Sequence, residues 1–197
     1  MIFSLTLFLL LGAAFVVQEF LPAMAWAYHS RLLLVPVVFF ASSISVPFPV
    51  MLLFAFCTGM VWDARHLVID PAAAVATTAL DPLSMQTANP AFGYSVFIFG
   101  LLGSLMQGIR PLFRRGRWEL PVLMSGVATA LLLVITYLWI SFLRGSFEFS
   151  DETWLNIGST ALLSMMVSPL VFLAVHWLST VSGYQIRYEG IKLRRSW

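Results

Sequence analysis

The ionisable residues of this sequence form no recognised catalytic or metal-binding pattern. Asp63, His66 and Asp70 are the closest group of potential metal ligands, but their spacing matches no known ligand motif. The carboxylates of Glu19, Asp63 and Glu148 lie far apart in the sequence, and nothing in the sequence fixes their separation. The chain contains no GxSxG, HExxH, P-loop or GxGxxG motif. We therefore predict no enzyme activity, no cofactor and no metal site.

Small residues recur at helical spacing in one apolar segment, where they can bring two helices together. Gly100, Ser104 and Gly108 are four residues apart, so they form one stripe along a helix. Helices in lipid associate through close packing and interhelical hydrogen bonds rather than through the hydrophobic effect. The stripe is therefore predicted to serve either packing within this chain or docking of a partner's transmembrane helix.

A second stripe of small polar residues lies in the last apolar segment. It contains Thr160, Ser164 and Ser168, and Pro169 follows directly. Polar side chains inside a membrane usually face the interior of the helix bundle or a cavity. This stripe is compatible with hydrogen bonds within the chain, with a partner contact or with a small-ligand cavity.

A third candidate group ends an earlier apolar segment, at Gly59 and Asp63. Gly59 allows another helix to approach closely, and Asp63 is placed at or just beyond the membrane interface. Arg65 and His66 are near enough in sequence to interact with the Asp63 carboxylate. We expect Asp63 to fix this corner of the molecule.

The elements that carry these residues are predicted to be membrane-spanning helices. Of the 197 residues, 60% are hydrophobic and 10% are charged, and the mean hydropathy is +0.90. Soluble domains are about 45–50% apolar and about 25% charged, so this composition excludes a soluble globular protein. The net charge is +2, but the basic residues lie between apolar runs instead of lining a groove, which argues against nucleic-acid binding.

The lengths of the apolar runs predict an all-α membrane protein with a bundle of six transmembrane helices. A helix needs roughly 20 residues to cross the hydrocarbon layer. The predicted spans cover residues 2–21, 26–46, 48–62, 92–113, 120–143 and 154–178, within a single membrane domain of residues 1–197. An extracytoplasmic insert is predicted at residues 63–91 and a cytoplasmic tail at residues 179–197.

The basic residues predict how the bundle is oriented in the membrane. With six spans, three of the eleven basic residues, Arg31, Arg65 and Arg144, fall on one side. The other eight fall on the opposite side, which the positive-inside rule makes cytoplasmic, together with both termini. These eight are Arg110, Arg114, Arg115, Arg117, Arg187, Lys192, Arg194 and Arg195. Among them, Arg114, Arg115 and Arg117, together with Trp118, are predicted to anchor the chain at the membrane interface.

The order of these features resembles the MreD family of rod shape-determining proteins. The resemblance covers roughly residues 34–178, but the segment between Asp63 and Phe92 is longer here than is usual in that family. The matching residues are Gly59 and Asp63 of a GxxxD motif, the Gly93-Tyr94 corner, the basic exit Arg110-Pro111-Leu112-Phe113, and Asn156 with Pro169-Leu170-Val171-Phe172 in the last span.

The resemblance implies a non-enzymatic scaffold in the inner membrane that maintains rod shape by helping to position peptidoglycan synthesis. It implies binding to MreC, association with RodA and its transpeptidase, and an indirect link to the actin-like MreB. It also implies a fold similar to the substrate-binding subunits of energy-coupling-factor vitamin transporters. The alternative is therefore a transporter subunit whose outer cavity is lined by residues such as Gln18, Glu19, Asn156 and Thr160.

Overall fold

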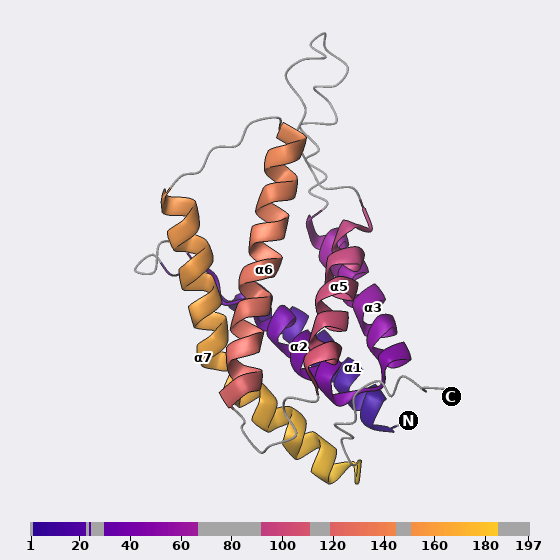
Figure 1. The fold of residues 1–197 in the computed structure, drawn as a ribbon. Helices are drawn as coiled ribbons and strands as arrows, with labels where there is room; N and C mark the ends of the chain where they lie inside the picture. The colour runs from indigo at the N-terminus through magenta and orange to yellow at the C-terminus, as the bar shows by residue number, and fades with distance from the viewer. Residues whose placement is uncertain are drawn as a thin grey trace, which may run out of the picture.

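The computed structural model describes residues 2–22, 24, 30–66, 92–110, 119–144 and 151–184. Over these ranges the regular secondary structure is helical, with one isolated β-bridge between Met24 and Ser30 (Figure 1). The described helices are α1 (Ile2–Phe20), α2 (Leu34–Ser45), α3 (Phe48–His66), α5 (Tyr94–Ile109), α6 (Glu119–Arg144) and α7 (Asp151–Val181).

Four of these helices, α1, α3, α6 and α7, are long and apolar enough to cross a membrane. α2 and α5 are apolar but shorter, with 12 and 16 residues. Large apolar side chains on the outside of the bundle are exposed, including Phe20 at 81%, Met166 at 76% and Phe97 at 70%. Proteins that are surrounded by water rarely expose so much apolar surface, whereas a lipid environment favours it.

Several helix bounds differ from those predicted from the sequence. α2 begins at Leu34 instead of residue 26, and residues 31–33 are not helical. The start coincides with Pro36, which is favoured in a first helical turn because its missing N–H is not needed there. α3 continues to His66, four residues beyond the predicted end. α5 covers Tyr94–Ile109, and residues 111–113 of the predicted span lie outside the described ranges.

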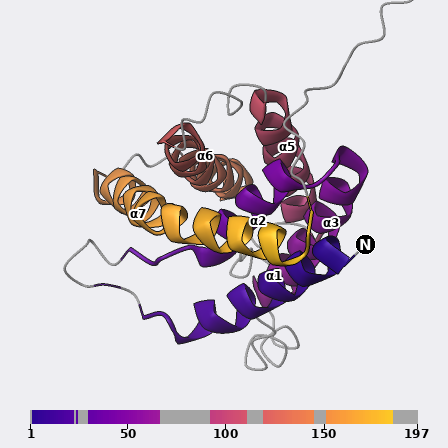
Figure 2. The ribbon, with the colours of Figure 1, turned by 90° about the horizontal axis from the view of Figure 1, so that it is seen from below.

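The short helix α2 lies in the centre of the bundle. Every residue from 35 to 46 is buried, and α2 contacts α1, α3, α5, α6 and α7. Figure 2 shows α2 among the other helices when the bundle is seen from below. α2 is therefore the interior element around which the longer helices pack.

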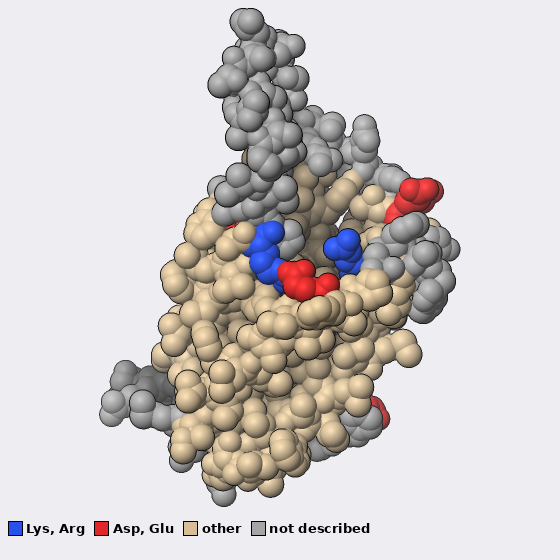
Figure 3. Space-filling view, turned by 180° about the vertical axis from the view of Figure 1, so that it is seen from behind, with Lys and Arg blue, Asp and Glu red and all other residues tan. Residues whose placement is uncertain are grey.

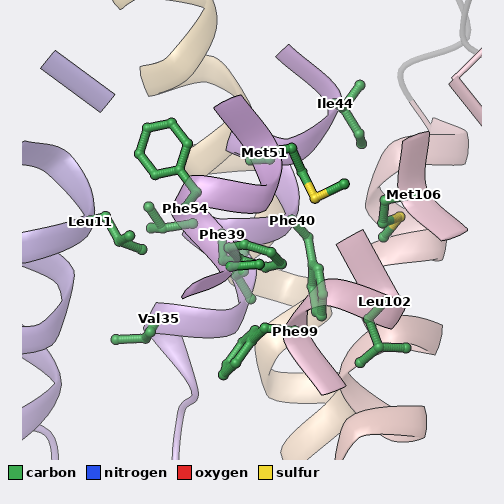
Figure 4. Close-up of a cluster of buried hydrophobic side chains, with 14 of the residues drawn as sticks. Leu11, Val35, Phe39, Phe40, Ile44, Met51, Phe54, Phe99, Leu102 and Met106 are labelled. Atoms are coloured by element: carbon green, nitrogen blue, oxygen red, sulfur yellow. The ribbon is translucent and has the colours of Figure 1, made fainter. Parts of the chain in front are cut away.

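Aromatic side chains from α2 and α5 form the middle of this core. The ring of Phe39 lies edge-on to that of Phe99, with centroids 5.0 Å apart, and Met51 from α3 lies close by (Figure 4). Gly103 of α5 makes this packing possible, since a Cβ atom there would lie only 2.6 Å from the Met51 sulfur and 3.0 Å from Phe39 Cζ. The core thus fixes α5 against both α2 and α3.

Contacts between the helix termini define two opposite ends of the bundle. The rings of Phe3 and Tyr184, near the two extremities of the described chain, stack with centroids 4.4 Å apart. We call this the terminal end. The opposite end, which we call the corner end, holds Glu19, Arg65 and Gly93. Both described extremities of the chain therefore lie on the same side of the bundle.

Candidate functional site

The corner between α3 and α5 is held by a single carboxylate. The backbone N–H of Gly93 donates a hydrogen bond to Oδ2 of Asp63 at 2.6 Å, and Asp63 is 7% exposed. Gly93 has a φ of 97°, a left-handed conformation that glycine adopts without the steric penalty of a side chain. Asp63 therefore fixes the point where the chain enters α5.

One helical turn before Asp63, Gly59 brings the backbones of α3 and α5 into direct contact. A Cβ atom on Gly59 would lie 2.4 Å from both Cα and N of Val96, which is closer than a Cβ atom approaches nonbonded backbone atoms. Because Gly59 and Asp63 are four residues apart, they share one face of α3. This face meets Val96 and Gly93, so the two residues of the GxxxD motif form an internal packing corner.

The corner end is also tied to α1 and α6. Arg65 of α3 forms an ion pair with Glu19 of α1, and its guanidinium lies 5.7 Å from the ring centroid of Phe15. Tyr94 of α5 stacks on Trp139 of α6, with centroids 4.8 Å apart, and its hydroxyl donates to the carbonyl of Ile135 in α6. Figure 3 shows a hollow at this end, with basic and acidic side chains gathered at its rim.

Glutamine side chains from neighbouring helices satisfy both ends of α2. Oε1 of Gln18 accepts a hydrogen bond from the N–H of Val35 at 2.8 Å. At the other end, Nε2 of Gln107 donates to the carbonyls of Ser43 at 2.6 Å and Val46 at 2.7 Å. Arg110 also donates to the Val46 carbonyl, at 3.3 Å. These contacts supply the partners that the backbone at both ends of a helix otherwise lacks.

The sequence analysis does not predict the contacts at the two ends of α2. The feature that could have predicted them is the presence of Gln18 and Gln107 in apolar segments, because a buried amide must find hydrogen-bond partners. The transporter alternative places Gln18 and Glu19 on the wall of an outer cavity. In the structure Gln18 bonds to α2 and Glu19 pairs with Arg65.

The stripe of Gly100, Ser104 and Gly108 lies on the outer surface of α5. At both glycines, a Cβ atom would meet nothing within 4 Å in the described part of the chain. The Ser104 hydroxyl donates to the carbonyl of Gly100 in the same helix at 2.7 Å. Phe97, Leu101 and Leu105 are exposed beside these residues. We call the stripe the α5 furrow, since it is a row of small residues flanked by large apolar ones.

The second polar stripe lies inside the bundle. Thr160 is 3% exposed, and Ser164 and Ser168 are both fully buried. The Ser168 hydroxyl donates to the carbonyl of Met165 at 2.9 Å. These residues face the interior of the molecule, where α7 packs against α6 and α2. Ser164 and Ser168 are therefore not on a surface that a partner helix could reach.

Other predicted features fall outside the residues that the structure describes. They include the four predicted interface anchors and Asp70, which was considered as a metal ligand. Within the described ranges, no three His, Cys, Asp or Glu residues are grouped so that they could hold a metal ion. The anchors outside these ranges are Arg114, Arg115, Arg117 and Trp118.

A cleft separates the ends of α6 and α7 that are joined by residues 145–150. The two helices touch at Gly126, where a Cβ atom would lie 3.0 Å from Cβ of Met165, and they diverge from there (Figure 1). The cleft has a volume of about 670 Å³. Its lining residues are Leu133, Thr136, Tyr137, Ile140, Glu152, Thr153, Asn156 and Ile157.

Comparison with known proteins identified no relative of this chain. No family model, no curated protein and no solved structure matches it.

Proposed function

We propose that this chain is a non-enzymatic scaffold of the bacterial cell-elongation machinery in the inner membrane. It binds MreC and thereby helps to position peptidoglycan synthesis by RodA and its transpeptidase, with an indirect link to MreB. The proposal starts from the resemblance to MreD. The observation that supports it best is the corner, where Gly59 and Asp63 contact Val96 and Gly93, because two separate motifs of the resemblance meet there.

The corner gives the scaffold a rigid pair of helices. The Gly59 contact and the Asp63 hydrogen bond join α3 to α5 near the corner end, and the Gly103 contact joins them again in the core. α5 is therefore held in place while its opposite face stays exposed. A rigid exposed face suits docking, because little conformational entropy is lost when a partner binds.

The α5 furrow is the proposed binding surface for the transmembrane helix of MreC. Small residues at Gly100, Ser104 and Gly108 let a second backbone approach closely, which strengthens van der Waals packing and interhelical hydrogen bonds. The neighbouring exposed side chains of Phe97 and Leu101 can then contact the flank of the docked helix.

The proposed orientation puts the terminal end in the cytoplasm. Phe3, Arg110 and Tyr184 mark this end in the structure, and the arginine-rich segment that follows Arg110 begins there. Basic residues in short loops favour the cytoplasmic side. The corner end, with Asp63, then faces the outer side, near the periplasmic part of MreC.

Co-purification with MreC tests the furrow. Ser104→Leu and Gly108→Leu fill the furrow with a bulky side chain, and we expect each to reduce recovered MreC severalfold while the protein still inserts. Gly12→Leu is a matched control, because Gly12 is an exposed helical glycine of α1 whose Cβ would also meet nothing within 4 Å. Recovery of MreC at the wild-type level with both furrow variants would contradict docking at this surface.

The competing proposal is the substrate-binding subunit of a vitamin transporter, with a fold similar to the energy-coupling-factor subunits. One observation favours it: Asn156, expected on the wall of its cavity, does line a cleft. Nanomolar binding of a water-soluble vitamin to the purified chain, with transport proteins instead of MreC among the co-purified partners, would replace the scaffold proposal.

A further inference from the structure

We propose that the cleft between α6 and α7 binds a membrane lipid whose head carries a protonated primary amine. In this arrangement the ammonium group lies against the carboxylate of Glu152, and an acyl chain lies along the apolar walls of the cleft. This inference goes beyond the proposed scaffold function and does not depend on it.

The cleft lies beyond a close approach of α6 and α7. Gly126 and Met165 bring α6 and α7 together, and the helices are separated beyond this point. Ile140 is 14 residues beyond Gly126, or about 21 Å along the helix axis. The volume of about 670 Å³ lies within the roughly 300–1,000 Å³ of small-molecule sites. The cleft is thus large enough for an amphiphile.

The level of the cleft matches the border between the hydrocarbon and headgroup layers. Trp139 on α6 and Trp154 on α7 are partly exposed near its open end. Tryptophan rings favour the headgroup level, which places Glu152 among the lipid heads. The deeper lining residues, Leu133 and Ile157, are then at the level of the acyl chains.

The charge at the mouth of the cleft favours a cation. Asp151 and Glu152 are both exposed in the first turn of α7. The two full negative charges of Asp151 and Glu152 outweigh the roughly half positive charge of the N-terminus of α7, so this end of α7 attracts a cation. An anionic head is repelled there. A primary ammonium can donate charge-assisted hydrogen bonds to Glu152, whereas a trimethylammonium head has no N–H to donate.

The lining also distinguishes a lipid from a docked helix. Its walls combine bulky apolar side chains, such as Leu133 and Ile140, with the hydroxyl groups of Thr136 and Thr153. Surfaces that bind transmembrane helices are instead rich in small residues, as the α5 furrow is. A flexible acyl chain fits between branched side chains more readily than a helix backbone does.

Native mass spectrometry of the purified full chain tests the proposal. The chain is titrated with phosphatidylethanolamine, phosphatidylglycerol and phosphatidylcholine that carry identical acyl chains. We expect phosphatidylethanolamine to bind most tightly, and Glu152→Gln to weaken its binding about tenfold, as expected for loss of a charge-assisted hydrogen bond. Glu119→Gln, the same change at an exposed residue at the start of α6, is the matched control and leaves binding unchanged.

A second pair of variants tests the cleft volume without changing charge. Ile140→Trp fills the cleft and is expected to abolish preferential phosphatidylethanolamine binding. Leu131→Trp changes an exposed residue of α6 that does not line the cleft, and it is expected to bind like the wild type. An acyl chain that carries a photoreactive diazirine is expected to label peptides containing residues 133–140 and 152–157.

Four outcomes would overturn the proposal. The first is equal binding of the three lipids, and the second is wild-type binding by both Glu152→Gln and Ile140→Trp. The third is displacement of the lipid by millimolar phosphoethanolamine, which would make the ligand a soluble amine. The fourth is crosslinking of the cleft in membranes to a protein helix instead of a lipid. None of these bears on MreC recovery, so the scaffold proposal can fail or stand separately.

Discussion

At the scale of single residues, the corner between α3 and α5 depends on one missing side chain and one carboxylate. Gly59 removes the atoms that would collide with Val96, and Asp63 supplies the acceptor for the N–H of Gly93. The two roles differ physically. Gly59 acts through excluded volume, whereas Asp63 acts through a hydrogen bond in a buried place, where an unmade bond is costly.

Replacement of Gly59 is predicted to separate α3 from α5. In Gly59→Leu the new side chain has no space against the Val96 backbone, and overpacking of this kind lowers the free energy of unfolding by about 1–3 kcal/mol. Thermal unfolding of the purified protein in detergent measures the loss. Gly100→Leu is the matched control on α5, because its Cβ meets open space, and a stability change as large as that of Gly59→Leu would contradict this explanation.

At the scale of elements, the position of α2 depends on partners from other helices. Its 12 residues extend about 18 Å, well short of the roughly 30 Å hydrocarbon layer. Residues 35–46 are all buried within the bundle, so the backbone groups at both ends need partners from the protein itself. Gln18 from α1 meets one end, and Gln107 with Arg110 from α5 meets the other.

Loss of the Gln107 amide is predicted to destabilise the end of α2 locally. Gln107→Leu has a similar size but removes the amide donor to the Ser43 carbonyl and leaves Arg110 as the side-chain donor to the Val46 carbonyl, at a cost of about 1–3 kcal/mol. Hydrogen exchange should rise in residues 42–46 more than in residues 35–38. Gln18→Leu is the comparison variant, and it should show the reverse pattern, since Gln18 accepts from Val35. Identical exchange patterns in the two variants would refute separate capping of the two ends.

At the scale of the whole molecule, the arrangement of the helix ends predicts which loops share a side of the membrane. The terminal end includes the turn after Val46 and the chain after α7, and the corner end includes Phe92 and Gly93. The stacking of Phe3 on Tyr184 fixes the two extremities of the described chain on the same side. An even number of crossings is required for this arrangement.

Cysteine labelling in intact cells measures this arrangement. In a Cys57→Ser background, Pro47→Cys and Gly183→Cys should be protected from an impermeant reagent until the membrane is opened. Phe92→Cys and Asp151→Cys, at exposed positions toward the other side, should react directly. Reaction of Gly183→Cys and Phe92→Cys from the same side would contradict both the helix arrangement and the assigned orientation.

The sequence predicted the bounds of α1 and α6 closely and those of α2 and α3 less closely. α1 and α6 begin and end within one residue of the predicted bounds, because their apolar runs end where the helices end. α2 begins eight residues later than predicted: the predicted span runs across His29, Ser30 and Arg31, and residues 30–33 are not helical in the structure. Hydropathy indicates which residues prefer lipid or the protein core, but in this segment it does not indicate where the helix begins.

The two small-residue stripes show the same limit for the candidate site. Gly100, Ser104 and Gly108 face outward, whereas Thr160, Ser164 and Ser168 face inward. Their spacing is identical, so spacing alone could not assign their directions. The direction depends on the position of every neighbouring helix. The partner of Gln107 was hidden for the same reason, since Ser43 is 64 residues away in sequence.

The two-ended capping of α2 has a consequence for how the protein is made. The donors at one end belong to Gln107 and Arg110, which leave the ribosome more than 60 residues after α2 has been synthesised. Until then, the last carbonyls of α2 lack the side-chain donors that they have in the folded bundle. α2 is therefore expected to wait beside the translocon, or at the membrane surface, and to settle only once α5 has emerged. A nascent chain stopped before Gln107 should retain α2 in contact with the insertion machinery, and one that extends past Arg110 should release it.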